Sequence, residues 1–187
     1  MNINQETLYA VALTRINYFN VATSLQLYRK LGSATTIMEH RHDILAVLPD
    51  ATPRLIEAFK DVSDAMRRAE KELEFDESHR IKPLVFNDDE YPQRLRECED
   101  APLVLYYRGS ADLNKQRVIS IVGTRHCTVY GQELINKFVS QLKELCPNVL
   151  IVSGLAYGVD IHAHRNALKN GFETVGVLAH GLDYLYP

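Results

Sequence analysis

The residues best suited to chemistry lie in two glycine-containing segments, each of which follows an apolar run. The first is ISIVGTRHCTVYG, residues 119–131, which places Arg125 two positions after Gly123. Arginine offers a planar fork of donors that matches a phosphate, and glycine lets a ligand approach the backbone closely. The second segment, SGLAYGVDIHAH, covers residues 153–164. Together the two segments predict a surface that binds phosphate.

Both segments are predicted to be strand-to-helix turns of a parallel sheet. The apolar runs QRVISIVG, NVLIVSG and ETVGVLA alternate with helical patterns over residues 129–145 and 160–170. This alternation is typical of parallel strands joined by right-handed crossovers. Anions bind at the carboxyl ends of such strands, because helix amides and dipoles converge there. A glycine-rich turn also serves simply to let a strand enter a helix, and for either turn alone that interpretation stays open.

The predicted phosphate-binding residues come from both turns and from the helices that follow them. Arg125 would make the charged contact, and the amides near Thr128 would surround the phosphate. Either Tyr130 or Tyr157 would stack on a base, although a tyrosine beside a glycine also serves as a packing residue. The full predicted set is Gly123, Thr124, Arg125, Thr128, Tyr130, Gly131, Ser153, Gly154, Gly158 and Arg165.

The second turn also allows a catalytic interpretation, because Ser153, Asp160, His162 and His164 lie close together in the sequence. However, the chain lacks the GxGxxG triplet of dinucleotide-binding dehydrogenases, and Ser153 lacks the GxSxG context of a nucleophile. Asp160 is most simply the N-cap of the following helix. We therefore predict no catalytic residue and no cofactor.

A metal site and a disulfide framework are not expected either. The three cysteines, Cys98, Cys127 and Cys146, are far apart and form no CxxC pair. The two HxH pairs, at residues 40–42 and 162–164, would place their rings on different faces of a helix, and no HExxH motif is present.

The composition is that of an ordinary globular protein. The 187 residues are 46% hydrophobic and 24% charged, with room for one or two domains. No apolar run approaches the roughly 20 residues that span a bilayer. The N-terminal MNINQETLY lacks the regions of a signal peptide, so we expect a cytoplasmic protein. The net charge is −3, yet residues 101–170 hold eight basic residues against four acidic ones, which is compatible with a local basic face.

The first eighty residues are predicted to be helical. The Thr52-Pro53 pair is typical of an N-cap followed by the first helical residue. Apolar residues then recur at intervals of three and four over residues 55–73, which predicts one amphipathic helix. Earlier, Gly32 is predicted to follow the end of a helix, and Ser33 to cap the next short one. That short helix is predicted to run through Ile37 and Ile44 and to end at Pro49. A boundary near residues 79–83 would divide the chain into a helical domain, 1–80, and an α/β core, 81–187.

Four ordered blocks between residues 82 and 187 resemble the DNA-processing protein A family, also called DprA or Smf. The blocks are FNDDEYPQRLRECEDAPLVLYYRG, IVGTRHCTVYG, IVSGLAYGVDIHAHRNAL and TVGVLAHGLDYLYP. The resemblance implies an α/β fold with a partial Rossmann-like parallel sheet, preceded by a small all-α domain that is SAM-like or helix-hairpin-helix-like. It also implies single-stranded DNA binding without catalysis, help in loading the RecA recombinase during natural transformation of competent cells, and a homodimer of the full-length protein.

Two features depart from the family pattern. The turn after Ile16, Asn17-Tyr18-Phe19, lacks the glycine of a helix-hairpin-helix, so we do not expect the helical domain to bind DNA phosphates. The family core continues beyond the Tyr-Pro that ends this chain, so a truncated core and weak or absent DNA binding are expected.

The core of the family also resembles enzymes that cleave nucleoside monophosphates. Their GGxGTxxE signature is absent here, and a nucleotide-binding or nucleotide-processing enzyme is kept as the alternative.

Overall fold

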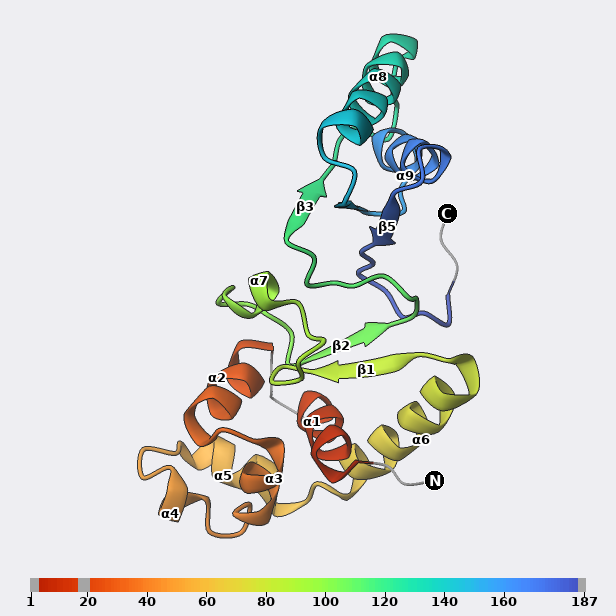
Figure 1. Cartoon of the computed structure of the whole chain (residues 1–187). Coiled ribbons are helices and arrows are strands. Elements are labelled where there is room, and N and C mark those ends of the chain that lie inside the picture. The colour runs from red at the N-terminus through yellow and green to blue at the C-terminus, as the bar shows by residue number, and fades with distance from the viewer. Residues whose placement is uncertain (1–3, 17–20, 185–187) are drawn as a thin grey trace. The chain divides into compact units, whose positions relative to one another are not determined.

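The computed structural model describes residues 4–16 and 21–184, and the chain divides into two compact units. Unit 1 comprises residues 1–109 and unit 2 comprises residues 110–187 (Figure 1). The turn predicted at Asn17-Tyr18-Phe19 lies outside the described residues.

Unit 1 begins with helices whose ends follow the capping signals of the sequence. The helices are α1 Gln5–Arg15, α2 Val21–Leu31, α3 Ala34–Glu39, α4 Ile44–Val47, α5 Pro53–Lys60 and α6 Ser63–His79. The Ser33 side chain accepts a hydrogen bond from the Thr36 amide (3.0 Å), and Thr52 accepts one from the Leu55 amide (3.3 Å). Gly32, directly after α2, has a φ of +85°, a conformation that glycine adopts without strain. The predicted caps and the helix end at Gly32 are thus confirmed. The single short helix predicted from Ser33 to Pro49 is wrong, because a turn at residues 40–43 separates α3 from α4.

The single helix predicted over residues 55–73 is wrong, because the chain breaks between α5 and α6. Asp61 adopts an extended conformation, and its carboxylate accepts a hydrogen bond from the amide of Ser63 (2.9 Å). A short acidic side chain that bonds the backbone two residues ahead offers the chain an alternative to the helical hydrogen bond. Both helices turn their apolar sides inward, so the apolar spacing continues across the break. The periodicity of the sequence therefore did not reveal where α5 ends and α6 begins.

A carboxylate from α1 caps α3. The Glu6 side chain accepts hydrogen bonds from the Ala34 amide (2.8 Å), the Thr35 amide (2.9 Å), the Thr35 hydroxyl (2.6 Å) and the Tyr28 hydroxyl (2.9 Å). Burial opposes ionisation of Glu6, but these donors outweigh it and hold the pKa of Glu6 below its usual value. Glu6 therefore ties three helices together at the point where α3 begins.

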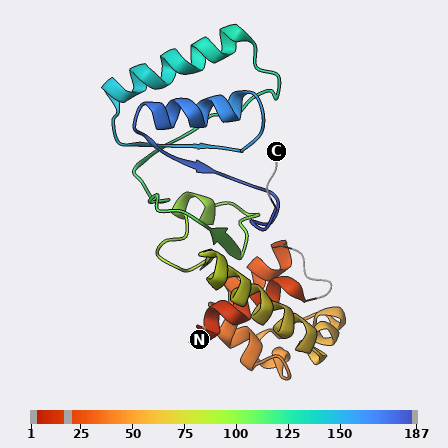
Figure 2. The same ribbon diagram turned by 90° about the vertical axis from the view of Figure 1, so that its right-hand side faces the viewer.

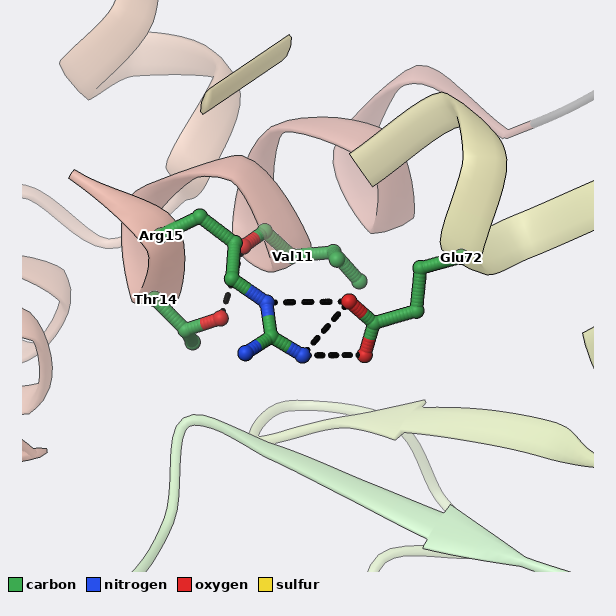
Figure 3. Close-up of polar contacts among 4 residues, drawn as sticks. All are labelled: Val11, Thr14, Arg15 and Glu72. Carbon is green, nitrogen blue, oxygen red and sulfur yellow. Dashed lines mark hydrogen bonds and ion pairs between the residues drawn. The ribbon is translucent and has the colours of Figure 1, made fainter. Parts of the chain in front are cut away.

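Unit 1 ends with two antiparallel strands, β1 Lys82–Val85 and β2 Val104–Tyr107. Between them lies the short helix α7 Gln93–Arg96. The strands pack against α1 and α6, and Figure 3 shows that the guanidinium of Arg15 on α1 meets the carboxylate of Glu72 on α6 above them. The two atoms Nε and Nη2 of Arg15 lie 2.5–2.9 Å from the two Glu72 oxygens, a bidentate ion pair.

The compact unit thus reaches further than the expected helical domain of residues 1–80. The physical reason is that the β1–β2 pair buries its apolar residues, among them Leu84 and Val85, in the same unit as the helices. Whether residues 1–80 also fold as a separate domain stays a prediction.

Unit 2 contains a three-stranded parallel sheet. Its elements are β3 Arg117–Ser120, α8 Val129–Leu145, β4 Val149–Ser153, α9 Val159–Lys169 and β5 Glu173–Gly176. The strand order is β3-β4-β5, with Arg117 opposite Val149 and Leu150 opposite Glu173. Figure 2 shows α8 and α9 side by side on one face of the sheet, where they enclose the core of the unit. That core consists of Val139, Leu142, Val149, Ile151, Ala167 and Phe172.

This arrangement confirms the predicted α/β fold with a partial Rossmann-like parallel sheet. The helix predicted over residues 129–145 has the observed bounds of α8, because Thr128 caps it and apolar residues at helical spacing face the sheet. Consecutive parallel strands with helices on one face bring the turns after β3 and β4 to the same edge. The fold therefore places the two glycine-containing segments, residues 119–131 and 153–164, next to each other.

Candidate nucleic-acid interface

The turn after β3 and the turn after β4 pack directly on one another. The Val159 amide, at the start of α9, donates a hydrogen bond to the Thr124 carbonyl oxygen (3.1 Å). A Cβ at Gly158 would lie 2.1 Å from the same oxygen, and Gly158 has a φ of +82°. A Cβ at Gly123 would lie 2.7 Å from the Val159 side chain. Both glycines are thus needed for this close approach, and the two turns form one surface.

The first turn is organised by two threonines. The Thr124 hydroxyl accepts a hydrogen bond from the His126 amide (3.2 Å), and the Thr128 hydroxyl accepts one from the Gly131 amide (3.1 Å) as the N-cap of α8. The Gly131 amide is therefore used within the protein. The amides of Val129 and Tyr130 belong to the first turn of α8 and have no partner within the helix. They remain available to an anion in front of this helix.

Arg125 lies between these two threonines, and its side chain is exposed. With the residues that the structure describes, Arg125 makes no hydrogen bond or ion pair. Tyr130, in the first turn of α8, is 73% exposed. Arg165 is also exposed, but it lies six residues into α9, about 9 Å along the helix axis from Val159. Arg125 is thus the cation that the backbone of the paired turns presents directly.

Ser153, the polar residue that ends β4, has a structural role. It is buried, and its hydroxyl donates a hydrogen bond to the Ile121 carbonyl oxygen (2.5 Å), which connects β4 to the end of β3. A hydroxyl engaged in this way is not presented to a ligand. We therefore leave Ser153 out of the proposed phosphate contacts.

The prediction of Asp160 as an N-cap is wrong, because Gly158 precedes α9 and caps it without a side chain. The positive φ of Gly158 lets the chain enter the helix earlier than the sequence suggested. Asp160 is instead the second residue of α9, and its side chain is 8% exposed. Its carboxylate lies against Gly154, 2.6 Å from the position of a Cβ there. The positive end of the α9 dipole favours a negative charge at this position.

The buried side chain of His164 supports the second turn by contacting its backbone, a role that was not predicted from the sequence. Its ring is buried, with Nε2 2.5 Å from the Gly154 carbonyl oxygen and Nδ1 2.7 Å from the Thr174 hydroxyl oxygen. That hydroxyl lies 2.8 Å from the Ile151 carbonyl oxygen. The available signal was that His164 lies four residues after Asp160, on the same side of the helix.

Residues 4–16 and 21–184 contain neither a metal-binding cluster nor a helix that could span a membrane. Among them, no three histidine, cysteine or acidic side chains are grouped so that they would hold a metal ion. None of the helices in that part of the chain has the length and apolar character needed to cross a membrane. The three cysteines are free thiols.

Comparison with known proteins identifies the family. The model of the family described as "DNA recombination-mediator protein A" matches residues 82–187, more than half of the chain. The chain belongs to the DNA recombination-mediator protein A family. The match begins at β1, so the family segment includes the β1–β2 pair and the whole of unit 2.

Curated members of this family share substantial identity with the chain. The DNA processing protein DprA of Streptococcus pneumoniae is 43% identical over 100 residues, which cover 54% of this chain and 34% of that protein. DprA of Bacillus subtilis is 38% identical over 109 residues, 57% of this chain and 36% of that protein. The protein Smf of Escherichia coli is 32% identical over 105 residues, 56% of this chain and 28% of that protein.

The fold of the whole chain also matches a solved structure. The X-ray structure of DprA from Streptococcus pneumoniae superposes with a TM-score of 0.71 at 30% identity, and it covers 97% of this chain and 60% of the solved one. The alignments to the curated relatives cover about a third of their length. Family membership is therefore established for a segment shorter than the relatives.

Proposed function

We propose that this chain binds single-stranded DNA through the paired turns of unit 2. The observation that carries the proposal is the position of Arg125, an exposed guanidinium on a turn that packs against a second turn and precedes the N-terminus of α8. A planar cation beside unpaired helix amides is suited to a phosphodiester. The description of the family as DNA recombination mediators supports DNA as the source of that phosphate.

The proposed contacts follow from the geometry. Arg125 and the first amides of α8 hold a phosphate, and Thr124 and Thr128 fix the turn that carries them. Four glycines (Gly123, Gly131, Gly154 and Gly158) allow the close packing, since a Cβ at each would lie less than 3 Å from a neighbouring atom. Tyr130, in the first turn of α8, and Arg165, farther along α9, are also exposed.

We propose further that the chain acts without catalysis and without a cofactor. The polar side chains of the second turn support this, because Ser153 bonds the Ile121 carbonyl and His164 lies against the Gly154 carbonyl. The Asp160 carboxylate is buried against Gly154. Ser153 and His164 are thus engaged with backbone carbonyl oxygens of the protein itself.

In the whole protein, the proposed role is that of a cytoplasmic recombination mediator. It would load the RecA recombinase onto single-stranded DNA taken up during natural transformation, as a homodimer. Membership of the recombination-mediator family supports this role, and the contacts with RecA and with a second subunit are proposed for the full-length protein.

The test is fluorescence anisotropy of a labelled oligo-dT titrated with the 187-residue chain. Arg125→Ala should weaken binding about 10- to 100-fold, as expected for one charge-assisted hydrogen-bonded contact. Arg117→Ala is the matched control, because it removes the same exposed charge at the opposite end of β3. Equal affinities of the Arg125 variant and the wild type would contradict the site. Release of free base from nucleoside monophosphates would instead favour the enzymatic alternative.

A further inference from the structure

Two large side chains are exposed in the loop between β4 and α9, residues 154–158: Leu155, which is 38% exposed, and the aromatic side chain of Tyr157. Tyr157 is 60% exposed. A single exposed tyrosine is common on protein surfaces, so its significance depends on how the loop is supported. In this loop the residues on both sides of Tyr157 are fixed by contacts with the body of unit 2.

The loop is fixed first on the side of β4 and β5. The Gly154 carbonyl oxygen lies 2.5 Å from Nε2 of the buried His164. Leu155 packs over Gly176, since a Cβ at Gly176 would lie 2.7 Å from Cγ of Leu155. Both contacts precede Tyr157 by only two or three residues, so the backbone that enters this position is immobilised.

The loop is fixed next on the side of the first turn. Gly158 follows Tyr157 directly, and a Cβ on it would lie 2.5 Å from the carbonyl carbon of Arg125. The next residue, Val159, donates its amide to the Thr124 carbonyl oxygen (3.1 Å). The backbone next to Tyr157 therefore touches the backbone of Arg125. The fold thus brings together the backbones of two residues with exposed side chains, Tyr157 and Arg125, from segments 32 residues apart.

Such a pair matches the repeating unit of single-stranded nucleic acid, a phosphate followed by an open base. Binding of single strands combines basic contacts to the backbone with aromatic rings on which bases stack. A rigid support reduces the entropy that is lost when the ring is immobilised by a ligand. In a duplex the faces of the bases are covered by their neighbours, so a stacking tyrosine would select unpaired strands.

We propose that Tyr157 stacks on an unpaired nucleobase adjacent to the phosphate held by Arg125. This inference rests on the proposed function and names the residue that distinguishes a single strand from a duplex. Tyr130 differs in its setting, because Leu134 and Phe138 are also exposed at the following four-residue intervals on α8. Tyr130 thus continues an apolar stripe of that helix, whereas Tyr157 belongs to the surface of the paired turns.

The test compares two oligonucleotides of equal length and equal phosphate number, oligo-dT and a fully abasic strand. Tyr157→Leu should weaken oligo-dT binding about 5- to 30-fold, the range expected for one stacked base, and should leave the abasic strand unaffected. Tyr157→Phe keeps the ring and should bind both strands like the wild type. The chain contains no tryptophan, so Tyr157→Trp supplies a lone fluorophore that oligo-dT should quench and the abasic strand should not.

The outcomes separate this inference from the proposed function. If Arg125→Ala weakens oligo-dT binding but Tyr157→Leu binds oligo-dT like the wild type, the stacking role is overturned and the phosphate site stands. A loss of affinity by Tyr157→Leu that is equal for both strands also overturns stacking, because it indicates a general change of the loop. Failure of the wild type to bind either strand overturns the proposed function together with the inference.

Discussion

Replacing Asp76 by asparagine should stabilise unit 1 at neutral pH. The Asp76 side chain on α6 is only 4% exposed, and its Oδ2 atom has no hydrogen-bond partner among the described residues. Burial, aided by the nearby charge of Glu72 and opposed by Arg15 and His79, raises the pKa of Asp76 from 3.8 to about 6. At neutral pH the folded protein therefore holds an ionised carboxylate in a place that favours the neutral acid.

The magnitude follows from this difference in pKa. Each pKa unit corresponds to about 1.4 kcal/mol, so ionisation of Asp76 costs the folded state up to about 3 kcal/mol relative to the unfolded state. Because the folded pKa of Asp76 is raised, its favourable contribution is complete below pH 3.8 and is lost as the pH rises through about 6. Asp76→Asn should match the wild type near pH 4 and exceed its free energy of unfolding by about 2 kcal/mol at pH 7.5.

The assay is urea unfolding between pH 4 and 8. Unfolding is measured by hydrogen exchange in the peptide that contains β1 and β2, because this peptide reports on unit 1 and not on unit 2. The difference between variant and wild type isolates Asp76 from other titrating groups. Glu77→Gln, an exposed position next to Asp76 on α6, is the matched control and should give a flat difference. Parallel pH profiles for Asp76→Asn and the wild type would refute the reasoning.

Two further substitutions test the supports of each unit. Glu6→Gln should lower the free energy of unfolding of unit 1 by about 1–2 kcal/mol at pH 7, because the charged acceptor at the start of α3 is lost. Since the pKa of Glu6 is lowered, this deficit should vanish in acid, as the pH falls through the folded pKa of the wild type, and urea unfolding at several pH values measures it. Gly158→Ala should destabilise unit 2 by more than about 2 kcal/mol, because its Cβ would meet the Thr124 carbonyl oxygen at a strained φ. Gly171 also has a positive φ, but a Cβ there would meet only the Lys143 Nζ atom, at 3.8 Å. Gly171→Ala therefore measures the cost of backbone strain alone, and thermal unfolding compares the two variants.

A persistent deficit of Glu6→Gln in acid would mean that the carboxylate charge is not what stabilises α3. Equal losses for the Gly158 and Gly171 variants would mean that backbone conformation alone, and not the packing of the two turns, requires glycine at Gly158.

Local signals predicted much of the fold. Thr128 caps the start of α8, and Ser33 and Thr52 are N-caps at the positions where caps were predicted. The break at Asp61 was missed because a short polar side chain competes with the helix without disturbing the apolar period. The contacts of Glu6 and Arg15 depend on residues about thirty and fifty-seven positions away, and no local pattern encodes them.

The candidate site was predictable in outline and not in detail. Alternation of strands and helices indicated that both turns share one edge of the sheet, and Arg125 stands out by residue type. The packing of Gly158 on Thr124, the burial of Asp160 and the support from His164 depend on tertiary contacts. Ser153 looked functional because its polar side chain follows a buried strand, yet its hydroxyl bonds a neighbouring strand.

The proposal that the paired turns of unit 2 hold the phosphate of single-stranded DNA predicts which backbone amides a DNA strand contacts. Its most direct test is a titration of the isotopically labelled chain with oligo-dT, followed by NMR amide chemical shifts, which detect weak binding. We expect shifts concentrated at residues 124–131 and 154–159, with little change at the amino ends of β3 and β4 and weaker shifts in the Arg125→Ala variant. Shifts concentrated in unit 1, or at the amino ends of the strands of unit 2, would contradict it.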